Sequence, residues 1–253
     1  MVITPSNFKG GVGKTTTSLL LSYILTKHKD KKVLVIDTDP QENLTYSIST
    51  TFKKSLDPNK NIFNACFDNS TIEENIQSIT DNLDLLAGEW KMTEFETEAN
   101  RQYKQSQQKN ILSIVISPIM NNYDYIIIDT SPYINLVMDN VIHVTDYVVI
   151  TTQTDSMAFE STKRYYDYLL SMAVNTDFKL LGVLPYLVGD SSTDKYYLQE
   201  YNDVFGDELF NHKVKHSDRV KTWNRKGITE DKPYDKKTLA MYENVVDEML
   251  EKM

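Results

Sequence analysis

A glycine-rich stretch near the N-terminus, "NFKGGVGKTTT" from Asn7 to Thr17, runs directly into the apolar segment "TSLLLSYIL". Glycine at three of four successive positions allows positive φ and lets several backbone N–H groups converge on one anion. The apolar segment is typical of a buried helix, whose N-terminus adds about half a positive charge at the same point. The stretch therefore predicts a phosphate-binding loop that opens a core helix. A glycine-rich turn without a ligand is the alternative.

The strict pattern of such a loop is G-x-x-x-x-G-K-[ST], and Phe8 occupies the place of its first glycine. The rest of the pattern is intact. By position, Lys14 would reach the β- and γ-phosphates of a nucleotide, and the Thr15 hydroxyl would bind Mg²⁺. Phosphate contacts are expected from Lys9, Gly10, Gly11, Val12, Gly13, Lys14, Thr15 and Thr16. Lys9 is a second lysine for which the ordinary pattern has no role.

Apolar runs of strand length alternate with helical patterns along the rest of the chain. The expected strands are Val33–Ile36, Leu83–Ala87, Tyr125–Ile128, Tyr147–Thr151 and Leu180–Leu187. The expected helices are Thr15–His28, Asn110–Met120, Phe159–Ala173, Lys195–Phe205 and Thr238–Glu251. This alternation indicates a doubly wound α/β fold, a mostly parallel sheet with helices on both faces. We expect one domain over residues 1–253, with ligands bound at the carboxyl ends of the strands.

Carboxylates follow two of these expected strands. Asp37 and Asp39 lie in "VIDTDPQEN", and Asp129 lies in "IIIDTSP". A single aspartate at a strand end is often a turn residue, but three at two strand ends beside a phosphate loop suggest a joint role. Mg²⁺ prefers oxygen ligands and keeps several of its waters, which carboxylates can hold. A further carboxylate can orient the water that attacks the γ-phosphate.

Composition limits the class of protein. The 253 residues carry a net charge of −9, so a nucleic-acid site would have to be a local patch. Cys66 is the single cysteine in the sequence, and neither a disulfide framework nor a thiolate metal cluster is expected. No apolar stretch approaches the ~20 residues that cross a bilayer, and nothing resembles a signal peptide. These features predict a cytoplasmic protein.

Three motifs, "KGGVGKTT", "DTDPQEN" and "IIIDTSP", resemble in order and spacing those of the deviant Walker ATPases of the ParA/MinD family. The second motif is most similar to that of ParA partition proteins. The resemblance implies that Lys9 crosses the interface of an ATP-bound homodimer to the phosphates of the partner. It also implies that Asp39 helps to activate the attacking water, and that Asp37 and Asp129 hold magnesium, with the acids acting through water.

The function implied by this resemblance is DNA partition, of a plasmid or a chromosome. MgATP would drive a sandwich homodimer that binds double-stranded DNA non-specifically on the nucleoid. Hydrolysis would be slow and stimulated by a ParB-like adaptor bound to a centromere. Because the phosphate loop lies so near the first residue, we expect the small form of the family, without an N-terminal helix-turn-helix domain, and with no membrane partner.

A basic segment, "NHKVKHSDRVKTWNRKG" from Asn211 to Gly227, carries six lysines and arginines against one acid, a local charge of +5. A solvated loop is the alternative. The partition proteins have an isoleucine or valine here, an arginine five residues on and a glycine eight further, and Val214, Arg219 and Gly227 match that spacing. The resemblance implies DNA binding by Arg219. Further DNA-binding candidates are Lys221, Arg225, Lys213 and Lys215.

Two other functions remain open. A MinD-like positioning ATPase should end in a basic amphipathic helix, whereas "YENVVDEMLEKM" is acidic. We expect its apolar residues, Val245, Val246, Met249 and Leu250, to pack on the domain. An iron–sulfur relative is excluded because it needs more cysteines than Cys66. A nucleotide-gated scaffold with little turnover is the alternative of a different class, and the presence of Asp39 favours turnover.

Overall fold

The computed structural model describes residues 1–68 and 70–253, with the side chains of Lys221, Asn224 and Arg225 outside that description. In this part of the chain eight strands form one sheet in the order β3-β4-β2-β5-β1-β6-β7-β8. They are β1 (Val2–Ser6), β2 (Val33–Asp37), β3 (Gln77–Thr80), β4 (Leu83–Leu86), β5 (Tyr125–Asp129), β6 (Tyr147–Thr152), β7 (Lys179–Val188) and β8 (Val214–Lys215). Strand β3 is antiparallel to β4, and the other paired neighbours are parallel. The predicted mostly parallel α/β sheet is confirmed.

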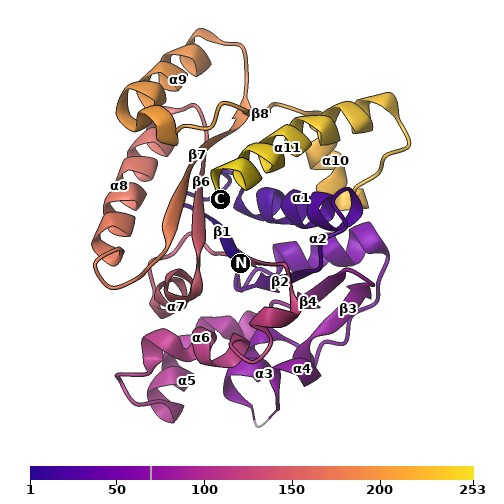
Figure 1. The fold of residues 1–253 in the computed structure, drawn as a ribbon, viewed down its shortest axis with the longest axis vertical. Helices are drawn as coiled ribbons and strands as arrows, with labels where there is room; N and C mark the ends of the chain where they lie inside the picture. The colour runs from indigo at the N-terminus through magenta and orange to yellow at the C-terminus, as the bar shows by residue number, and fades with distance from the viewer. Residues whose placement is uncertain (69) are drawn as a thin grey trace.

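Helices cover both faces of this sheet, as Figure 1 shows. They are α1 (Lys14–Lys27), α2 (Asn43–Phe52), α3 (Ile62–Phe67), α4 (Ile72–Asn75), α5 (Phe95–Gln102), α6 (Ile111–Ile116), α7 (Leu136–Val144), α8 (Ser156–Met172), α9 (Ser192–Phe205), α10 (Asp218–Lys226) and α11 (Pro233–Lys252). Short 3₁₀ turns lie at Trp90–Glu94, Gln108–Asn110, Met120–Asn122 and Gly206–Glu208.

The buried strands separate two cores because successive side chains of a strand point to opposite faces. On β2, Val33 and Val35 pack with α1, α2, α10 and α11. Leu34 and Ile36, between them in sequence, pack on the other face with α3, α5, α6 and α7. A third cluster lies on this second face under α8 and α9. The uninterrupted apolar strands of the sequence thus reflect burial on both sides.

Each of the five expected strands and five expected helices has a counterpart, with different ends in several cases. The largest shortening is in the helix expected over Asn110–Met120, whose α-helical part, α6, ends at Ile116. The basic segment contains a short strand, β8, and a helix, α10, so the alternative that it is a solvated loop throughout is wrong. Trp223 and Val220 of α10 are 1% and 2% exposed, and this burial holds the charged helix against the core.

Helix α11 lies beside α1 on the first face (Figure 1). As expected from its sequence, Val245, Val246 and Met249 are buried, and Leu250 packs against the same core. Its apolar side is therefore already covered by this chain. Among the described residues, no helix combines the length and the apolar character that crossing a bilayer requires.

A histidine ties the end of α1 to α11. His28 Nε2 lies 3.0 Å from Glu230 Oε1, and His28 Nδ1 contacts the carboxylate of Glu243. The hydroxyl of Tyr23 also donates to Glu230, at 2.7 Å. Burial disfavours the protonated imidazole, but the hydrogen bonds to two carboxylates outweigh it and raise the pKa of His28.

The stability of the fold should therefore depend on pH through His28. A pKa that is raised on folding stabilises the fold below the unfolded pKa of ~6.5, and this contribution is lost as the pH rises through the folded pKa. We expect His28→Gln to lower the free energy of unfolding by up to about 1 kcal/mol at pH 6, and by less at pH 9. Urea unfolding at both pH values, with the exposed His216→Gln as control, measures this. A difference from wild type that stays constant with pH contradicts it.

Candidate nucleotide site

The glycine-rich loop joins the end of β1 at Ser6 to the start of α1 at Lys14. Two of its glycines have positive φ, 79° at Gly11 and 94° at Gly13. A Cβ atom at Gly13 would lie 2.6 Å from the ring of Tyr186, so both the backbone angle and the close approach require glycine there. The loop thus has the conformation that places successive N–H groups before a helix N-terminus.

Phe8 departs from the strict loop pattern without changing this conformation. Its backbone does not have the positive φ that would call for glycine. Its ring turns away from the loop and packs edge-on against Tyr165, with 4.6 Å between ring centroids, and against Tyr168 at 5.2 Å. The side chain therefore helps to fasten the start of the loop to α8.

Lys14 lies inside the loop. Its Nζ donates a hydrogen bond to the carbonyl oxygen of Lys9 at 2.9 Å, and its side chain is largely buried. Burial lowers the pKa of Lys14, while the nearby carboxylates of Asp129 and Asp39 act in the opposite direction. An anion placed in the loop would favour the charged form further.

The strand-end acids meet as predicted, because Asp37 of β2 and Asp129 of β5 are partners in the parallel register. Asp129 accepts hydrogen bonds from the hydroxyls of Thr15, at 2.7 Å, and Ser18, at 3.0 Å. Asp37 accepts from the backbone N–H and the hydroxyl of Thr45, at 2.9 and 2.8 Å. Burial raises the pKa of both carboxyls, and the proximity of Asp129 raises that of Asp37 further.

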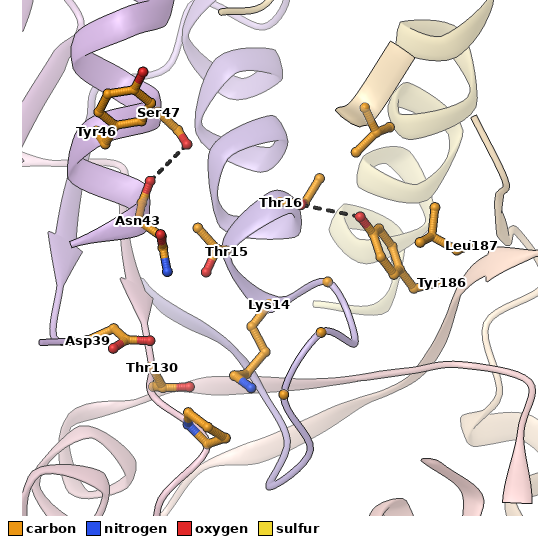
Figure 2. Close-up of a pocket in the computed structure, with 15 residues that line it drawn as sticks. Lys14, Thr15, Thr16, Asp39, Asn43, Tyr46, Ser47, Thr130, Tyr186 and Leu187 are labelled. Atoms are coloured by element: carbon orange, nitrogen blue, oxygen red, sulfur yellow. Dashed lines mark hydrogen bonds between the residues drawn. The ribbon is translucent and has the colours of Figure 1, made fainter. Parts of the chain in front are cut away.

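Asp39 follows Asp37 by two residues and lies at the edge of an open cavity. Its backbone N–H donates to Asp37 Oδ1 at 3.2 Å, and its own Oδ1 accepts from the N–H of Gln41 at 2.9 Å. This leaves the carboxylate facing the cavity across from the phosphate loop (Figure 2). The three acids therefore have different surroundings: Asp37 and Asp129 are enclosed, and Asp39 is accessible from the cavity.

The cavity has a volume of about 620 Å³. Six of the eight expected phosphate-contact residues line it: Gly10, Gly11, Gly13, Lys14, Thr15 and Thr16. In the described part of the chain, Val12 and Lys9 are not among the lining residues. The sequence analysis assigned no role in the site to the residues of the other walls, which are Asn43, Tyr46, Ser47, Thr130, Pro132, Tyr186, Leu187 and Val220.

Several of these walls are visible in Figure 2, with Tyr186 and Leu187 on the opposite side of the cavity from Asp39 and Thr130. The Tyr186 hydroxyl donates to Thr16 Oγ1 at 3.3 Å. Leu187 has a φ of 54°, unusual for a residue with a side chain. Asn43 and Thr130 belong to motifs already singled out in the sequence, whereas no local pattern marks Tyr186 or Leu187.

Lys9 does not line this cavity, and its side chain is bound by the carboxylate of the residue that precedes α8. Its Nζ lies 2.8 Å from Oδ1 and 2.9 Å from Oδ2 of Asp155, the residue that caps the N-terminus of α8. The two side chains are 23% and 43% exposed. Burial alone would raise the pKa of Asp155, but the hydrogen bonds from Lys9 and from the Ala158 N–H lower it. Lys9 therefore lies at the rim of the site as a partly exposed cation.

Three of the predicted DNA-binding residues, Lys213, Lys215 and Arg219, are not among the residues that line the nucleotide cavity. Arg219 makes an ion pair with the buried Asp235, with 2.7 Å between Nε and Oδ1. Lys213 and Lys215 line a separate groove with Arg219. The side chains of Lys221 and Arg225 lie outside the described residues. The roles assigned to all five in DNA binding stay predictions.

A strand, a glycine-rich loop carrying lysine and threonine, a helix and two strand-end acids together define a P-loop nucleotide site.

The family model described as AAA domain matches residues 1–180 of the chain. The uncharacterized protein MJECL24 of Methanocaldococcus jannaschii is 35% identical over 192 residues, which cover 73% of this chain and 72% of that protein. Sporulation initiation inhibitor protein Soj of Bacillus subtilis is 29% identical over 214 residues, covering 83% and 81%. The chain belongs to the ParA/MinD family of P-loop ATPases.

Solved structures agree with the fold. A putative plasmid partition protein from Borrelia burgdorferi, bound to AMPPNP, superposes with a TM-score of 0.82 at 24% sequence identity. The match covers 100% of this chain and 98% of that one. At this identity the likeness establishes the arrangement of the sheet and helices, and the chemistry has to be argued from the residues of this chain.

Proposed function

We propose that this chain is an ATP-dependent DNA partition ATPase that acts as a single domain. With MgATP it forms a homodimer, binds double-stranded DNA non-specifically and hydrolyses ATP slowly until a ParB-like, centromere-bound adaptor stimulates it. The observation that carries the proposal is the position of Lys9. It belongs to the phosphate loop, yet its ammonium lies at the rim, on Asp155, where a second copy facing the site can meet it.

The residues present fit ATP. The positive φ at Gly11 and Gly13 shapes the loop, and no atom lies within 4 Å of a Cβ built on Gly10 or Gly11, so phosphate oxygens can approach the backbone. Lys14 would exchange its bond to the Lys9 carbonyl for phosphate oxygens, a stronger charge-assisted interaction. The negative charge of a triphosphate held in this way would favour the protonated form of Lys14 and so offset the effect of burial, which lowers its pKa.

The same edge of the sheet fits Mg²⁺. Thr15 Oγ1 and an Asp129 oxygen lie 2.7 Å apart, and Asp37 is the register partner of Asp129. Thr15 would bind the ion directly, and the two acids would hold its waters. Magnesium, when bound, would supply positive charge that offsets the negative charge of the phosphates. Its charge would also lower the raised pKa values of Asp37 and Asp129.

Asp39 is placed to orient the attacking water. It faces the cavity, whereas the carboxylate of the nearby Asp37 accepts a hydrogen bond from the hydroxyl of Thr45. A carboxylate there would accept a proton or a hydrogen bond from water next to the γ-phosphate. The partner's Lys9 would then place positive charge on the opposite side of the transferring group, where negative charge develops.

The other parts of the proposed function are supported by different observations. Lys213, Lys215 and Arg219 lie together at a groove, which supports DNA binding. The burial of the apolar residues of α11 argues against the membrane-cycling alternative. The accessible Asp39 argues against a scaffold without turnover. The adaptor and the location on the nucleoid rest on membership of the family.

Lys9→Ala is the variant that tests the proposal. It should bind ATP with nearly unchanged affinity in calorimetry, because Lys9 does not line its own cavity, yet remain monomeric by light scattering and fail to release phosphate. Asp155→Asn is the matched control. It removes the charge that holds Lys9, and asparagine can still cap α8, so it should still dimerise.

DNA co-sedimentation of the wild type with ATP, with ADP and without nucleotide completes the test, and we expect DNA binding with ATP. If Lys9→Ala dimerises with ATP and turns over normally, the lysine does not act across an interface. If the wild type binds DNA equally in all three conditions, ATP does not control the binding.

A further inference from the structure

The residues that lead into the glycine-rich loop are held against α8. The hydroxyl of Tyr165, on this helix, donates to Ser6 Oγ at 2.7 Å, and the ring of Phe8 packs edge-on against the same tyrosine. The ammonium of Lys9 lies 2.8 Å from Asp155, which caps the helix. Residues far apart in sequence thus fasten the entrance of the loop, and Asn7 lies in the middle of this entrance.

The side chain of Asn7 is fully buried, and its hydrogen-bonding capacity is filled. Its Nδ2 donates to the carbonyl oxygen of Thr151 at 2.9 Å and to Thr162 Oγ1 at 3.1 Å. Its Oδ1 accepts from the hydroxyl of Ser161 and from the backbone N–H of Lys9, each at 3.0 Å. Because the Thr151 carbonyl can only accept and the Lys9 N–H can only donate, the amide has a single possible orientation.

The contact of Asn7 with Thr162 begins a chain of buried hydroxyl groups. Thr162 accepts from the Asn7 amide and donates to Thr152 Oγ1 at 2.8 Å. The hydroxyl of Thr152 lies 2.5 Å from that of Tyr201, which donates to the carbonyl oxygen of Gln153 at 3.0 Å. A buried polar chain in which each member has its partners keeps one arrangement. The amide of Asn7 therefore rests on a rigid support made by β6, α8 and α9.

The contact of Asn7 with Lys9 fixes a stretch of backbone that both lysines of the loop use. The Asn7 side chain accepts from the N–H two residues further on, which is the geometry of an Asx-turn. The carbonyl oxygen of Lys9 accepts from Lys14 Nζ at 2.9 Å. From this backbone the Lys9 side chain extends to Asp155. The turn at Asn7 therefore determines the direction in which Lys9 leaves the loop.

We propose that Asn7 is a positioning residue for Lys9: its amide fixes the backbone of Lys9 so that the ammonium lies at the rim, where a second copy can meet it. This inference rests on the proposed function and names a residue on which its lysine depends. A cation that acts across an interface has to be in place when the second copy binds, because a displacement of about 1 Å can cost about 100-fold in rate. The phosphate-loop pattern begins at Phe8, after Asn7, and gives no reason for an asparagine.

The position of Lys9 can be measured without ATP through the carboxyl group of Asp155. Burial raises the pKa of Asp155, and the hydrogen bonds from Lys9 and from the Ala158 N–H lower it. In a carbon-13 NMR titration we expect Asn7→Ala to raise this pKa as Lys9→Ala does, because the ammonium leaves its place. Thr162→Val is the matched control. It removes a buried hydroxyl from the same amide but leaves the bond to Lys9, so the pKa of Asp155 should match the wild type.

Both buried variants should lower the thermal unfolding midpoint, but Asn7→Ala alone should lose turnover. With MgATP it should still bind nucleotide, since Lys14 and Thr15 are unchanged, yet dimerise less in light scattering and release phosphate about 100-fold more slowly. Thr162→Val should release phosphate at the wild-type rate. Asn7→Ser should recover part of the rate, because a serine hydroxyl can make the same turn to the Lys9 N–H, although more weakly.

The outcomes separate this inference from the function on which it rests. If Asn7→Ala leaves the pKa of Asp155 unchanged, or raises it no more than Thr162→Val does, Asn7 does not position Lys9 and the inference is overturned. If Asn7→Ala no longer binds ATP, Asn7 supports the whole loop, and its particular role toward Lys9 is overturned. If the wild type neither dimerises nor releases phosphate with ATP, the proposed function fails, and the titration by itself decides whether Asn7 positions Lys9.

Hydrogen exchange of the wild type tests the same bond without any substitution. The N–H of Lys9 donates to a buried amide oxygen that is itself held in place. It should therefore exchange with solvent at least about tenfold more slowly than an unprotected amide. Exchange of the Lys9 N–H at the unprotected rate would overturn the inference, whether or not the Asn7 variants fold.

Discussion

Lys14→Ala is expected to abolish ATP binding at nucleotide concentrations that saturate the wild type. The side chain enters the loop between β1 and α1, and its ammonium would be the cation nearest to phosphates bound there. Truncating one partner of a buried, hydrogen-bonded charge pair costs about 3 kcal/mol, which raises Kd more than about 100-fold. Isothermal calorimetry with MgATP measures the loss directly.

The control for this variant is Lys27→Ala, which removes a lysine at the exposed far end of the same helix. Its ATP affinity should match the wild type. Since burial lowers the pKa of Lys14, the ligand-free fold contains a poorly solvated cation. Lys14→Ala should therefore unfold no more easily than the wild type without ATP. A variant that unfolds readily, or that binds ATP normally, would disagree with the position of Lys14.

Asp39→Ala is expected to trap the ATP-bound dimer. ATP and magnesium should still bind, because Lys14, Thr15 and Asp129 are unchanged. Hydrolysis should fall by about 10²–10⁴-fold, the usual contribution of a group that assists proton transfer. Phosphate release measures the rate, and light scattering should show a dimer that persists after free ATP is removed.

Asp37→Ala is the informative contrast to Asp39→Ala. Asp37 holds Thr45 and the backbone at Asp39, so its removal disturbs the edge of the sheet. It should weaken magnesium binding as well as turnover. An Asp39→Ala protein that cannot bind ATP at all, or that hydrolyses it at the wild-type rate, would show that Asp39 does not orient the water.

Much of the phosphate site could be predicted because its signals are local. The glycines with positive φ, Lys14 and Thr15 follow one another in sequence, and their conformation depends on their own residue types. The meeting of Asp37 and Asp129 followed from a general property of parallel sheets, in which strand ends share one edge. Both inferences needed a pattern and a rule, but no knowledge of distant packing.

The far wall of the cavity could not be predicted in this way. Tyr186 closes on the loop because Gly13 has no side chain, and this contact joins residues 173 positions apart. Leu187 has a left-handed backbone that its residue type does not favour. Asp155 was missed for the same reason. An aspartate before a helix is an ordinary cap, and its contact with Lys9 is made by the fold.

In the basic segment, the spacing of residues that matches the partition proteins can be explained by packing. Val214 is fully buried in the core. Gly227 has a φ of 82°, and a Cβ there would lie 2.7 Å from the backbone of Thr51. Arg219 is paired with Asp235. Each of the three residues that matched the family spacing therefore has a packing role, so the spacing alone does not identify the residues that touch DNA.

Helix α10 lines two separate cavities of the molecule. Val220 lines the nucleotide cavity, and Arg219, the residue before it, lines the separate groove that Lys213 and Lys215 also line. If ATP binds in the cavity and DNA in the groove, a rigid helix shared by both can give their binding a coupling free energy. If ATP improves the affinity for DNA by some factor, then DNA must improve the affinity for ATP by the same factor. A molecule resting on DNA would then retain its nucleotide longer than one in solution, and its lifetime on the DNA would be set by the rate of hydrolysis.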